Sequence, residues 1–222
     1  MLAFQPKNQI HTLMESGSPR QTQIKICGVT KTKQALSCVE MGADLIGLNC
    51  WNGSSRYIIP EIIGEIVLEL PESAKTVGIF VNESPDSIND IMKQTGMDWV
   101  QLHGDEPVET CEKLEFPWFK AFRVSTNFKI SLIKQYKQET FLIDAYSKFH
   151  FGGSGEKIDI DFAIKASGLG KMILAGGLTP ENVEEAVEKV KPWAVDVCSG
   201  VESKPGIKDL QLVEKFISKI IK

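Results

Sequence analysis

The sequence predicts a single (β/α)8 barrel, a closed parallel sheet of eight strands surrounded by helices. Short β-branched or apolar runs alternate with longer amphipathic segments over residues 23–222. No linker and no run of like charges interrupts this alternation. Because parallel strands are joined by helical crossovers, a regular strand–helix alternation is typical of α/β folds.

The other common α/β fold, a doubly wound open sheet, more often has a Gly-x-Gly-x-x-Gly turn after its first strand. Here the first expected strand is followed by Gly28-Val29-Thr30, which is no such turn. We therefore expect a barrel over 23–222. Residues 1–22 lack the apolar core of a signal peptide, and we interpret them as a flexible or loosely docked leader.

The first half of the expected barrel contains four strands and four helices. A helix capped by Thr30 follows the first strand, buries Ala35, Leu36 and Val39, and ends at Gly42. The next helices are expected over Pro60–Leu70, after the Ser84-Pro85 cap, and up to about Glu115. The four strands are Gln23–Cys27, Asp44–Asn49, Lys75–Val81 and Asp98–Leu102.

The second half repeats the pattern. Helices are expected around 127–137, from near Asp159, after Thr179-Pro180-Glu181, and at the C-terminus. The last helix has an apolar stripe formed by Ile207, Leu210, Val213, Phe216, Ile217 and Ile220. The four strands are Trp118–Val124, Thr140–Asp144, Lys171–Leu174 and Trp193–Cys198.

Composition excludes several functional classes. A net charge of −4 and a pI near 5.5 argue against nucleic-acid and membrane surfaces. The 5 cysteines and 3 histidines have neither zinc-site nor disulfide-framework spacing, so we expect no metal. No apolar run approaches the ~18 residues of a membrane span. An odd cysteine count without a secretion signal favours a cytoplasmic protein.

Polar residues gather at the expected strand ends, where barrels of this class form their active sites. Lys25 and Cys27 share one face of the first strand, although an isolated cysteine is most often a small buried hydrophobe. Asp196 on the closing strand should pair with Lys25. The remaining candidates are Arg56, His103, Arg123, Asp144 and Ser199, each of which could alternatively satisfy a backbone group or a surface charge.

Three glycine-rich turns follow the last three strands, at 152–155, 175–178 and 199–201. Glycine lets several backbone amides approach one anion, and loops after strands seven and eight commonly bind phosphate in this fold. The alternative is that these glycines only make tight turns. We favour phosphate binding and expect it at Gly153, Ser154, Gly155, Gly176, Gly177, Ser199 and Gly200.

Four blocks form a characteristic set: 25–30 (KICGVT), 101–106 (QLHGDE), 174–182 (LAGGLTPEN) and 196–202 (DVCSGVE) with 205–209 (PGIKD). This set resembles the phosphoribosylanthranilate isomerase family. The resemblance covers residues 23–222. It implies an Amadori rearrangement of N-(5′-phosphoribosyl)anthranilate in tryptophan biosynthesis, without metal or organic cofactor. It also implies that Cys27 is the general base, that Asp144 is the general acid, and that Arg56 binds the anthranilate carboxylate.

We further expect Lys25, His103, Arg123 and Asp196 to contact the substrate, and Lys25 to lower the pKa of the Cys27 thiol. The expected partner is a small phosphorylated substrate, and the expected assembly is a monomer or homodimer. Two other readings remain. A non-catalytic phosphosugar-binding barrel would need neither Cys27 nor Asp144. An indole-3-glycerol-phosphate synthase would need a catalytic lysine at a strand end with paired glutamates, which the sequence lacks.

Overall fold

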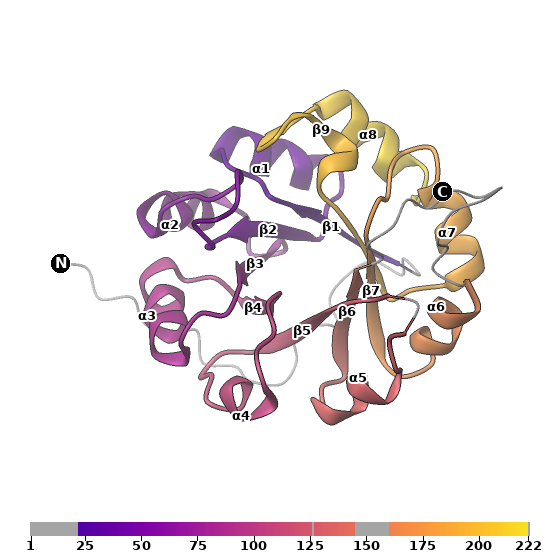
Figure 1. Ribbon diagram of the computed structural model, residues 1–222. Coiled ribbons are helices and arrows are strands. Elements are labelled where there is room, and N and C mark those ends of the chain that lie inside the picture. The colour runs from indigo at the N-terminus through magenta and orange to yellow at the C-terminus, as the bar shows by residue number, and fades with distance from the viewer. Residues whose placement is uncertain (1–21, 126, 145–159, 222) are drawn as a thin grey trace.

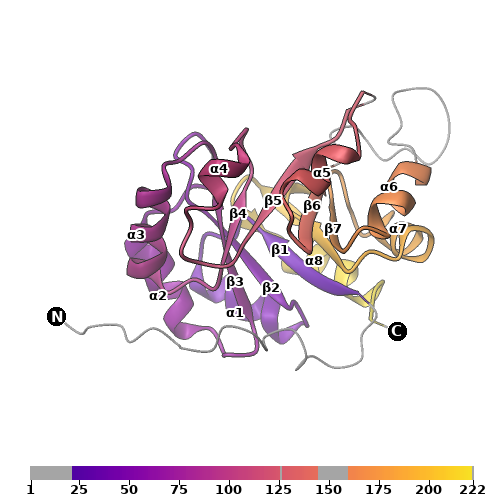
Figure 2. The same ribbon diagram turned by 90° about the horizontal axis from the view of Figure 1, so that it is seen from below.

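The computed structural model describes residues 22–125, 127–144 and 160–221 of the chain. Within this part, eight parallel strands close into one barrel in sequential order, β1 to β8. The helices lie outside the ring of strands (Figures 1 and 2). The predicted (β/α)8 fold is confirmed. The leader, the turn at 152–155 and the helix start near Asp159 fall outside the described residues.

The strands agree with the expected ones to within one or two residues. They are β1 Gln23–Cys27, β2 Leu45–Asn49, β3 Lys75–Phe80, β4 Trp99–Leu102, β5 Trp118–Arg123, β6 Thr140–Asp144, β7 Lys171–Ala175 and β8 Ala194–Val197. The helices are α1 Thr32–Glu40, α2 Pro60–Glu69, α3 Pro85–Thr95, α4 Val108–Cys111, α5 Ser131–Gln135, α6 Ile160–Ser167, α7 Val183–Val190 and α8 Leu210–Ser218.

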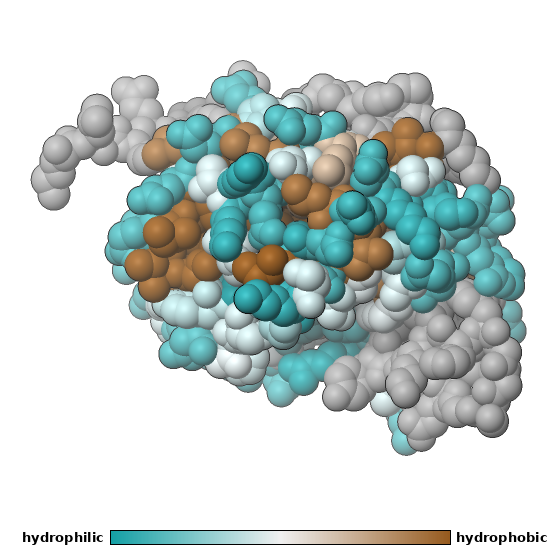
Figure 3. All heavy atoms as spheres, turned by 90° about the horizontal axis from the view of Figure 1, so that it is seen from above, coloured by the Kyte–Doolittle hydropathy of each residue, from teal (hydrophilic) through white to brown (hydrophobic). Residues whose placement is uncertain are grey.

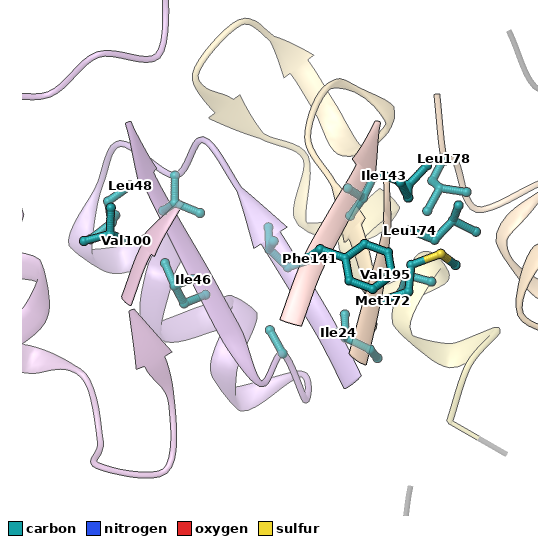
Figure 4. Packing of buried hydrophobic residues seen from close by; sticks show 14 of the residues in the cluster. Ile24, Ile46, Leu48, Val100, Phe141, Ile143, Met172, Leu174, Leu178 and Val195 are labelled. Carbon is teal, nitrogen blue, oxygen red and sulfur yellow. The ribbon is translucent and has the colours of Figure 1, made fainter. Parts of the chain in front are cut away.

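Side-chain alternation along the strands creates two cores. The larger core lies between the sheet and the helices, and Figure 4 shows part of it, with Ile46 and Val100 on one side and Phe141, Leu174 and Val195 on the other. The smaller one fills the barrel interior and includes Leu45, Val77, Phe119, Leu142 and Ile173. Interior residues further along the same strands emerge at the carboxyl ends, where the polar candidates lie.

The ring closes between β1 and β8, which pair in parallel. Lys25 is the register partner of Asp196, and Ile26 is the partner of Val197. Ile24 and Ile26 are fully buried in the outer core, so the alternate residues Lys25 and Cys27 face the barrel interior. The predicted face-sharing of Lys25 and Cys27 is therefore confirmed.

Several helix predictions are wrong in detail. Thr30 does not cap α1: the cap position is Lys31, and the Thr30 hydroxyl donates to the Gly206 carbonyl at 2.6 Å. Cys38 is buried on α1, whereas Leu36 is only half-buried. The helices α4 and α5 have only 4 and 5 residues, so both are shorter than the helices expected up to about Glu115 and around 127–137.

The C-terminal segment contains a hairpin where the apolar spacing predicted the start of the last helix. Ile207 belongs to this hairpin instead of the last helix, because its strand β10 (Ile207–Lys208) pairs antiparallel with β9 (Glu202–Lys204). A 3-10 turn, η1 (Ser199–Val201), leads into it from β8. Figure 1 shows β9 beside α1 and α8, at the seam where the barrel closes. The hairpin thus lies over the seam between β1 and β8.

Polar and apolar residues both contribute to the face of the barrel that Figure 3 shows. Figure 3 shows brown hydrophobic patches separated by teal hydrophilic residues on the face seen from above. Trp51, Tyr57, Ile59 and Ile62, which lie in the loop after β2 and at the start of α2, are among the exposed large apolar side chains. None of the helices in the described ranges has both the length and the apolar character needed to cross a membrane.

Candidate active site

The site has two groups of side chains on opposite sides of the barrel, which we call its walls. The first wall lies at the seam where β1 pairs with β8. The Lys25 ammonium donates to Asp196 Oδ1 at 3.0 Å, and both side chains are buried. The predicted Lys25–Asp196 pair is confirmed. Burial acts to lower the pKa of Lys25, but the adjacent carboxylate outweighs it and the pKa is raised. Lys25 is therefore a permanent cation beneath the mouth of the barrel.

Cys27 is half-buried at the end of β1, next to Lys25. A side chain at Gly47 on β2 would come within 2.9 Å of Cys27 Sγ and 3.1 Å of Lys25 Nζ, so only glycine lets both groups occupy this space. The pKa of the Cys27 thiol is well below its ordinary value. A hydrogen bond from Cys198 is the largest cause, and the charges of Lys25 and Lys208 add to it.

The predicted lowering by Lys25 is thus confirmed, but Lys25 is not the main cause. Cys198 follows β8 as Cys27 ends β1, so the two cysteines extend the β1–β8 register beyond Ile26 and Val197. The same hydrogen bond and burial raise the pKa of Cys198. Of the two thiols, Cys27 is therefore the one that loses its proton more readily.

Arg56, in the loop after β2, reaches this wall from the side. Its Nε donates to both oxygens of Glu202 at 2.9 and 3.2 Å, and its Nη2 donates to Oε2 at 2.6 Å. A Cβ at Gly28 would clash with the Arg56 side chain at 2.7 Å and contact Cys198 Sγ at 3.0 Å. Gly28, with a φ of 72°, therefore brings Arg56 and Cys198 together at the end of β1.

The opposite wall comes from β4, β5 and β6. His103 Nε2 lies 3.3 Å from Asp144 Oδ2, and Arg123 Nη2 donates to the His103 carbonyl at 3.1 Å. Gln101 Nε2 lies 2.8 Å from His103 Nδ1, so in this orientation the amide donates to Nδ1 and leaves the Nε2 proton for Asp144. Arg123 and Asp144 are register partners, and His103, Arg123 and Asp144 form one cluster.

A buried ion pair supports the loop that carries His103. Lys120 Nζ lies 3.2 Å from Glu106 Oε2 and donates to the Leu102 and Gly104 carbonyls at 3.2 and 2.7 Å. Glu106 in turn accepts from the Gly104 amide at 3.0 Å. Burial lowers the pKa of Lys120, although Glu106 opposes this shift. The pair holds the turn after His103 to the outer side of β5.

The two described glycine turns lie beside each other. A Cβ at Gly200 would collide with the Leu178 carbonyl, so the turn after β8 packs directly against the turn after β7. Gly176 and Gly177 have φ values of 91° and 70°, and their amides have no hydrogen-bond partner within the described ranges. Such amides suit an anion. Gly153, Ser154 and Gly155 lie outside the described residues.

The structure thus groups Lys25, Cys27, Arg56 and Asp196 on one wall and His103, Arg123 and Asp144 on the other. The sequence reasoning assigned no role to Cys198, Glu202 or Lys208. The signal for Cys198 was available, because it stands two residues after Asp196 and therefore on the same face. Glu202 and Lys208 could not be placed without the hairpin.

No group of three or more His, Cys, Asp or Glu side chains in the described part of the chain could hold a metal ion. The model of the N-(5′-phosphoribosyl)anthranilate (PRA) isomerase family matches residues 24–219. The chain belongs to the PRA isomerase family. The PRA isomerase of Geobacter sulfurreducens is 47% identical over 195 residues, which cover 88% of this chain and 96% of that protein.

Two solved structures of the PRA isomerase family support the assignment. One is a phosphoribosyl anthranilate isomerase in complex with reduced 1-(o-carboxyphenylamino)-1-deoxyribulose 5-phosphate, with a TM-score of 0.81 and 37% identity. The other contains monomers of the dimeric enzyme from Thermotoga maritima, also with a TM-score of 0.81 and 37% identity. Each alignment covers 90% of this chain and 98% of the solved chain.

Proposed function

We propose that this chain converts N-(5′-phosphoribosyl)anthranilate into 1-(2-carboxyphenylamino)-1-deoxyribulose 5-phosphate, an Amadori rearrangement in tryptophan biosynthesis, with Cys27 as base and Asp144 as acid. The single observation that carries the assignment of roles is the position of the Cys27 thiol at the end of β1, beside the buried Lys25 ammonium, where its pKa is lowered. A binding protein for a phosphosugar has no need of a thiolate in its pocket, whereas proton abstraction requires a base.

The rearrangement needs two proton transfers. Asp144 protonates the furanose ring oxygen, the bond between that oxygen and C1′ breaks, and the anthranilate nitrogen forms a Schiff base with C1′. The Cys27 thiolate then removes the proton from C2′. The resulting enolamine tautomerises, which places a carbonyl at C2′ and a methylene group at C1′.

The two walls suit these steps because they lie apart on the barrel. Cys27 is on β1 and Asp144 is on β6, and β7 and β8 separate these two strands in the ring. A sugar ring held across the mouth can therefore meet the acid on one side and the base on the other. His103 contacts Asp144 on the second wall, with Nε2 3.3 Å from Oδ2.

The substrate has two charged ends, a carboxylate and a phosphate, and different residues bind each of them. Arg56 binds the anthranilate carboxylate, since a planar guanidinium forms two parallel hydrogen bonds with such a group. The turns at 153–155, 176–177 and 199–200 bind the phosphate through backbone amides. His103 and Arg123 line the space between these ends, and the buried pair Lys25–Asp196 lies beneath it. No metal or organic cofactor enters either step.

The assembly is a monomer or a homodimer, in the cytoplasm. The exposed apolar residues after β2 offer a surface for a second copy, and the related Thermotoga maritima enzyme is dimeric. Analytical ultracentrifugation of the full chain distinguishes the two states.

Anthranilate fluorescence decides between the isomerase and a phosphosugar-binding barrel. Freshly made phosphoribosylanthranilate is mixed with the wild-type chain, and the fluorescence of the substrate is followed with time. The isomerase consumes the substrate catalytically. A barrel that only binds the substrate leaves the decay at the rate of the buffer control and removes the case for the reaction.

A further inference from the structure

The hairpin β9–β10 carries two buried charged residues that the reaction scheme above does not use. Glu202 and Lys208 are register partners across the hairpin, and their ion pair measures 2.9 Å. The Glu202 side chain is only 4% exposed and that of Lys208 is fully buried. Burying two charges is costly unless both are fully hydrogen-bonded, so the contacts of this pair indicate its purpose.

Glu202 accepts hydrogen bonds from four different groups, one of which is the Cys198 thiol, whose Sγ lies 3.9 Å from Oε1. Besides Lys208 and Arg56, the Gly206 amide donates to Oε1 at 3.2 Å. Burial acts to raise the pKa of Glu202, but the hydrogen bonds from Arg56 and Lys208 outweigh it and the pKa is lowered. Glu202 is therefore a fixed carboxylate, and it in turn fixes the guanidinium of Arg56.

The Arg56 contact uses only one edge of the guanidinium. Nε and Nη2 donate to Glu202, whereas the contact of Nη1 within the described residues is a marginal one of 3.5 Å to Ser55 Oγ. A guanidinium has a second edge, formed by Nη1 and Nη2, that can bind another carboxylate with two parallel hydrogen bonds. Glu202 leaves this edge free and sets its direction.

Lys208 connects the Glu202 carboxylate to the wall that contains Cys27 and Cys198. Its ammonium donates to the Cys198 carbonyl at 3.0 Å and lies 3.9 Å from Cys198 Sγ. The positive charge of Lys208 contributes to the lowered pKa of Cys27 and opposes the rise in the pKa of Cys198. Lys208 thus holds the chain after β8 and contributes to the field at the base.

We propose that Glu202 is the positioning residue for Arg56, and that Lys208 is the positioning residue for the Cys27–Cys198 pair, so that one hairpin aligns carboxylate recognition with proton abstraction. This inference rests on the proposed function. It adds that the hairpin determines selectivity for substrates with an aromatic carboxylate. The turn itself is held by Thr30, whose hydroxyl donates to Gly206, a glycine with a φ of 79°.

The role of Glu202 is tested by a double-mutant cycle on the binding of the reduced product analogue. Isothermal titration calorimetry gives the Kd of this analogue for wild type, Glu202→Gln, Arg56→Ala and the double variant. We expect Glu202→Gln to raise Kd about tenfold in the wild-type background and less than about twofold in the Arg56→Ala background, because the effect acts through Arg56. Equal effects in both backgrounds contradict the proposal.

Two further variants control for effects of the substitutions on folding. Glu185→Gln removes a carboxylate from an exposed ion pair with Lys189 and serves as the matched control, with Kd unchanged. The combined variant Glu202→Gln/Lys208→Met removes both buried charges, so that neither is left uncompensated. If Glu202→Gln does not fold, this variant replaces it in the cycle, and the same non-additivity with Arg56→Ala is expected.

The role of Lys208 is tested by the pH dependence of kcat/KM. We expect Lys208→Met to move the acidic limb to higher pH by about one unit, because the thiolate loses a nearby positive charge, while KM changes less than about threefold. An unshifted limb with a large rise in KM overturns this half of the proposal. If the wild type gives no turnover, the proposed function fails, and the binding cycle still tests Glu202 independently.

Discussion

Lys25 Nζ lies 3.0 Å from Asp196 Oδ1, across the two strands that close the barrel. The Lys25 side chain is fully buried and that of Asp196 is only 8% exposed, so each charge depends largely on the other for compensation. The pair therefore has a structural role at the seam as well as an electrostatic role beneath Cys27.

Removing one partner of this pair should cost more than removing both. We expect Asp196→Asn to lower the free energy of unfolding by about 3–5 kcal/mol, because it leaves the Lys25 charge buried without its carboxylate partner. The double variant Lys25→Met/Asp196→Leu should recover most of that loss. Urea unfolding followed by circular dichroism measures all three. Equal losses in the single and double variants would show that the pair is not coupled.

The thiol pair predicts a change in the pH profile. Cys198 donates to Cys27 and is the largest cause of its lowered pKa. The base is active as thiolate, so activity is present above the pKa of Cys27 and is lost as pH falls through it. Cys198→Ala removes the donor and should move the acidic limb of kcat/KM to higher pH. Cys198→Ser retains a donor and should shift it less. A profile unchanged in Cys198→Ala argues against Cys27 as the titrating base.

The buried Lys120–Glu106 pair predicts a selective loss of stability. Lys120→Met leaves the Glu106 carboxylate without its ammonium partner in a buried position, and we expect a loss of about 3–5 kcal/mol. The exposed pair Lys215–Glu181 is the matched control, and Lys215→Met should change stability by less than about 1 kcal/mol. Chemical denaturation measures both. Similar losses in the two variants would contradict the buried-pair argument.

The proposed acid and base predict a separation of binding from turnover. Cys27→Ala and Asp144→Ala remove proton transfer and leave Arg56 and the glycine turns in place. We therefore expect both variants to bind the reduced product analogue with a Kd within about threefold of the wild-type value. Such a change is well below the ~1.4 kcal/mol of binding free energy that a tenfold change in Kd represents. Titration calorimetry gives the affinities. A loss of binding that matches the loss of turnover would place these residues in substrate binding.

The sequence was sufficient for the features that follow from strand order and alternation. The Lys25–Asp196 pair could be predicted because strands one and eight must adjoin in a closed barrel, and because both residues lie at interior positions. Local helix signals were less informative. Thr30 has the residue type of a helix cap, but its hydroxyl bonds to Gly206, which is 176 residues away along the chain.

The partners of the site residues could not be predicted, for the same reason. Glu202 meets Arg56 only because the chain after β8 folds into a hairpin, and the apolar spacing from Ile207 onward suggested a continuous helix instead. Cys198 stood inside a motif whose family resemblance gave it no role. Long-range polar contacts of this kind depend on backbone geometry that residue spacing does not encode.

Turnover of freshly made phosphoribosylanthranilate, followed as loss of anthranilate fluorescence, tests the central claim most directly. The wild type should consume the substrate, and Cys27→Ala and Asp144→Ala should each lower kcat by a factor of about 10² or more, the range typical of general acid–base groups. A wild type without turnover would contradict the assigned reaction. Either variant with near-normal kcat would remove that residue from the mechanism.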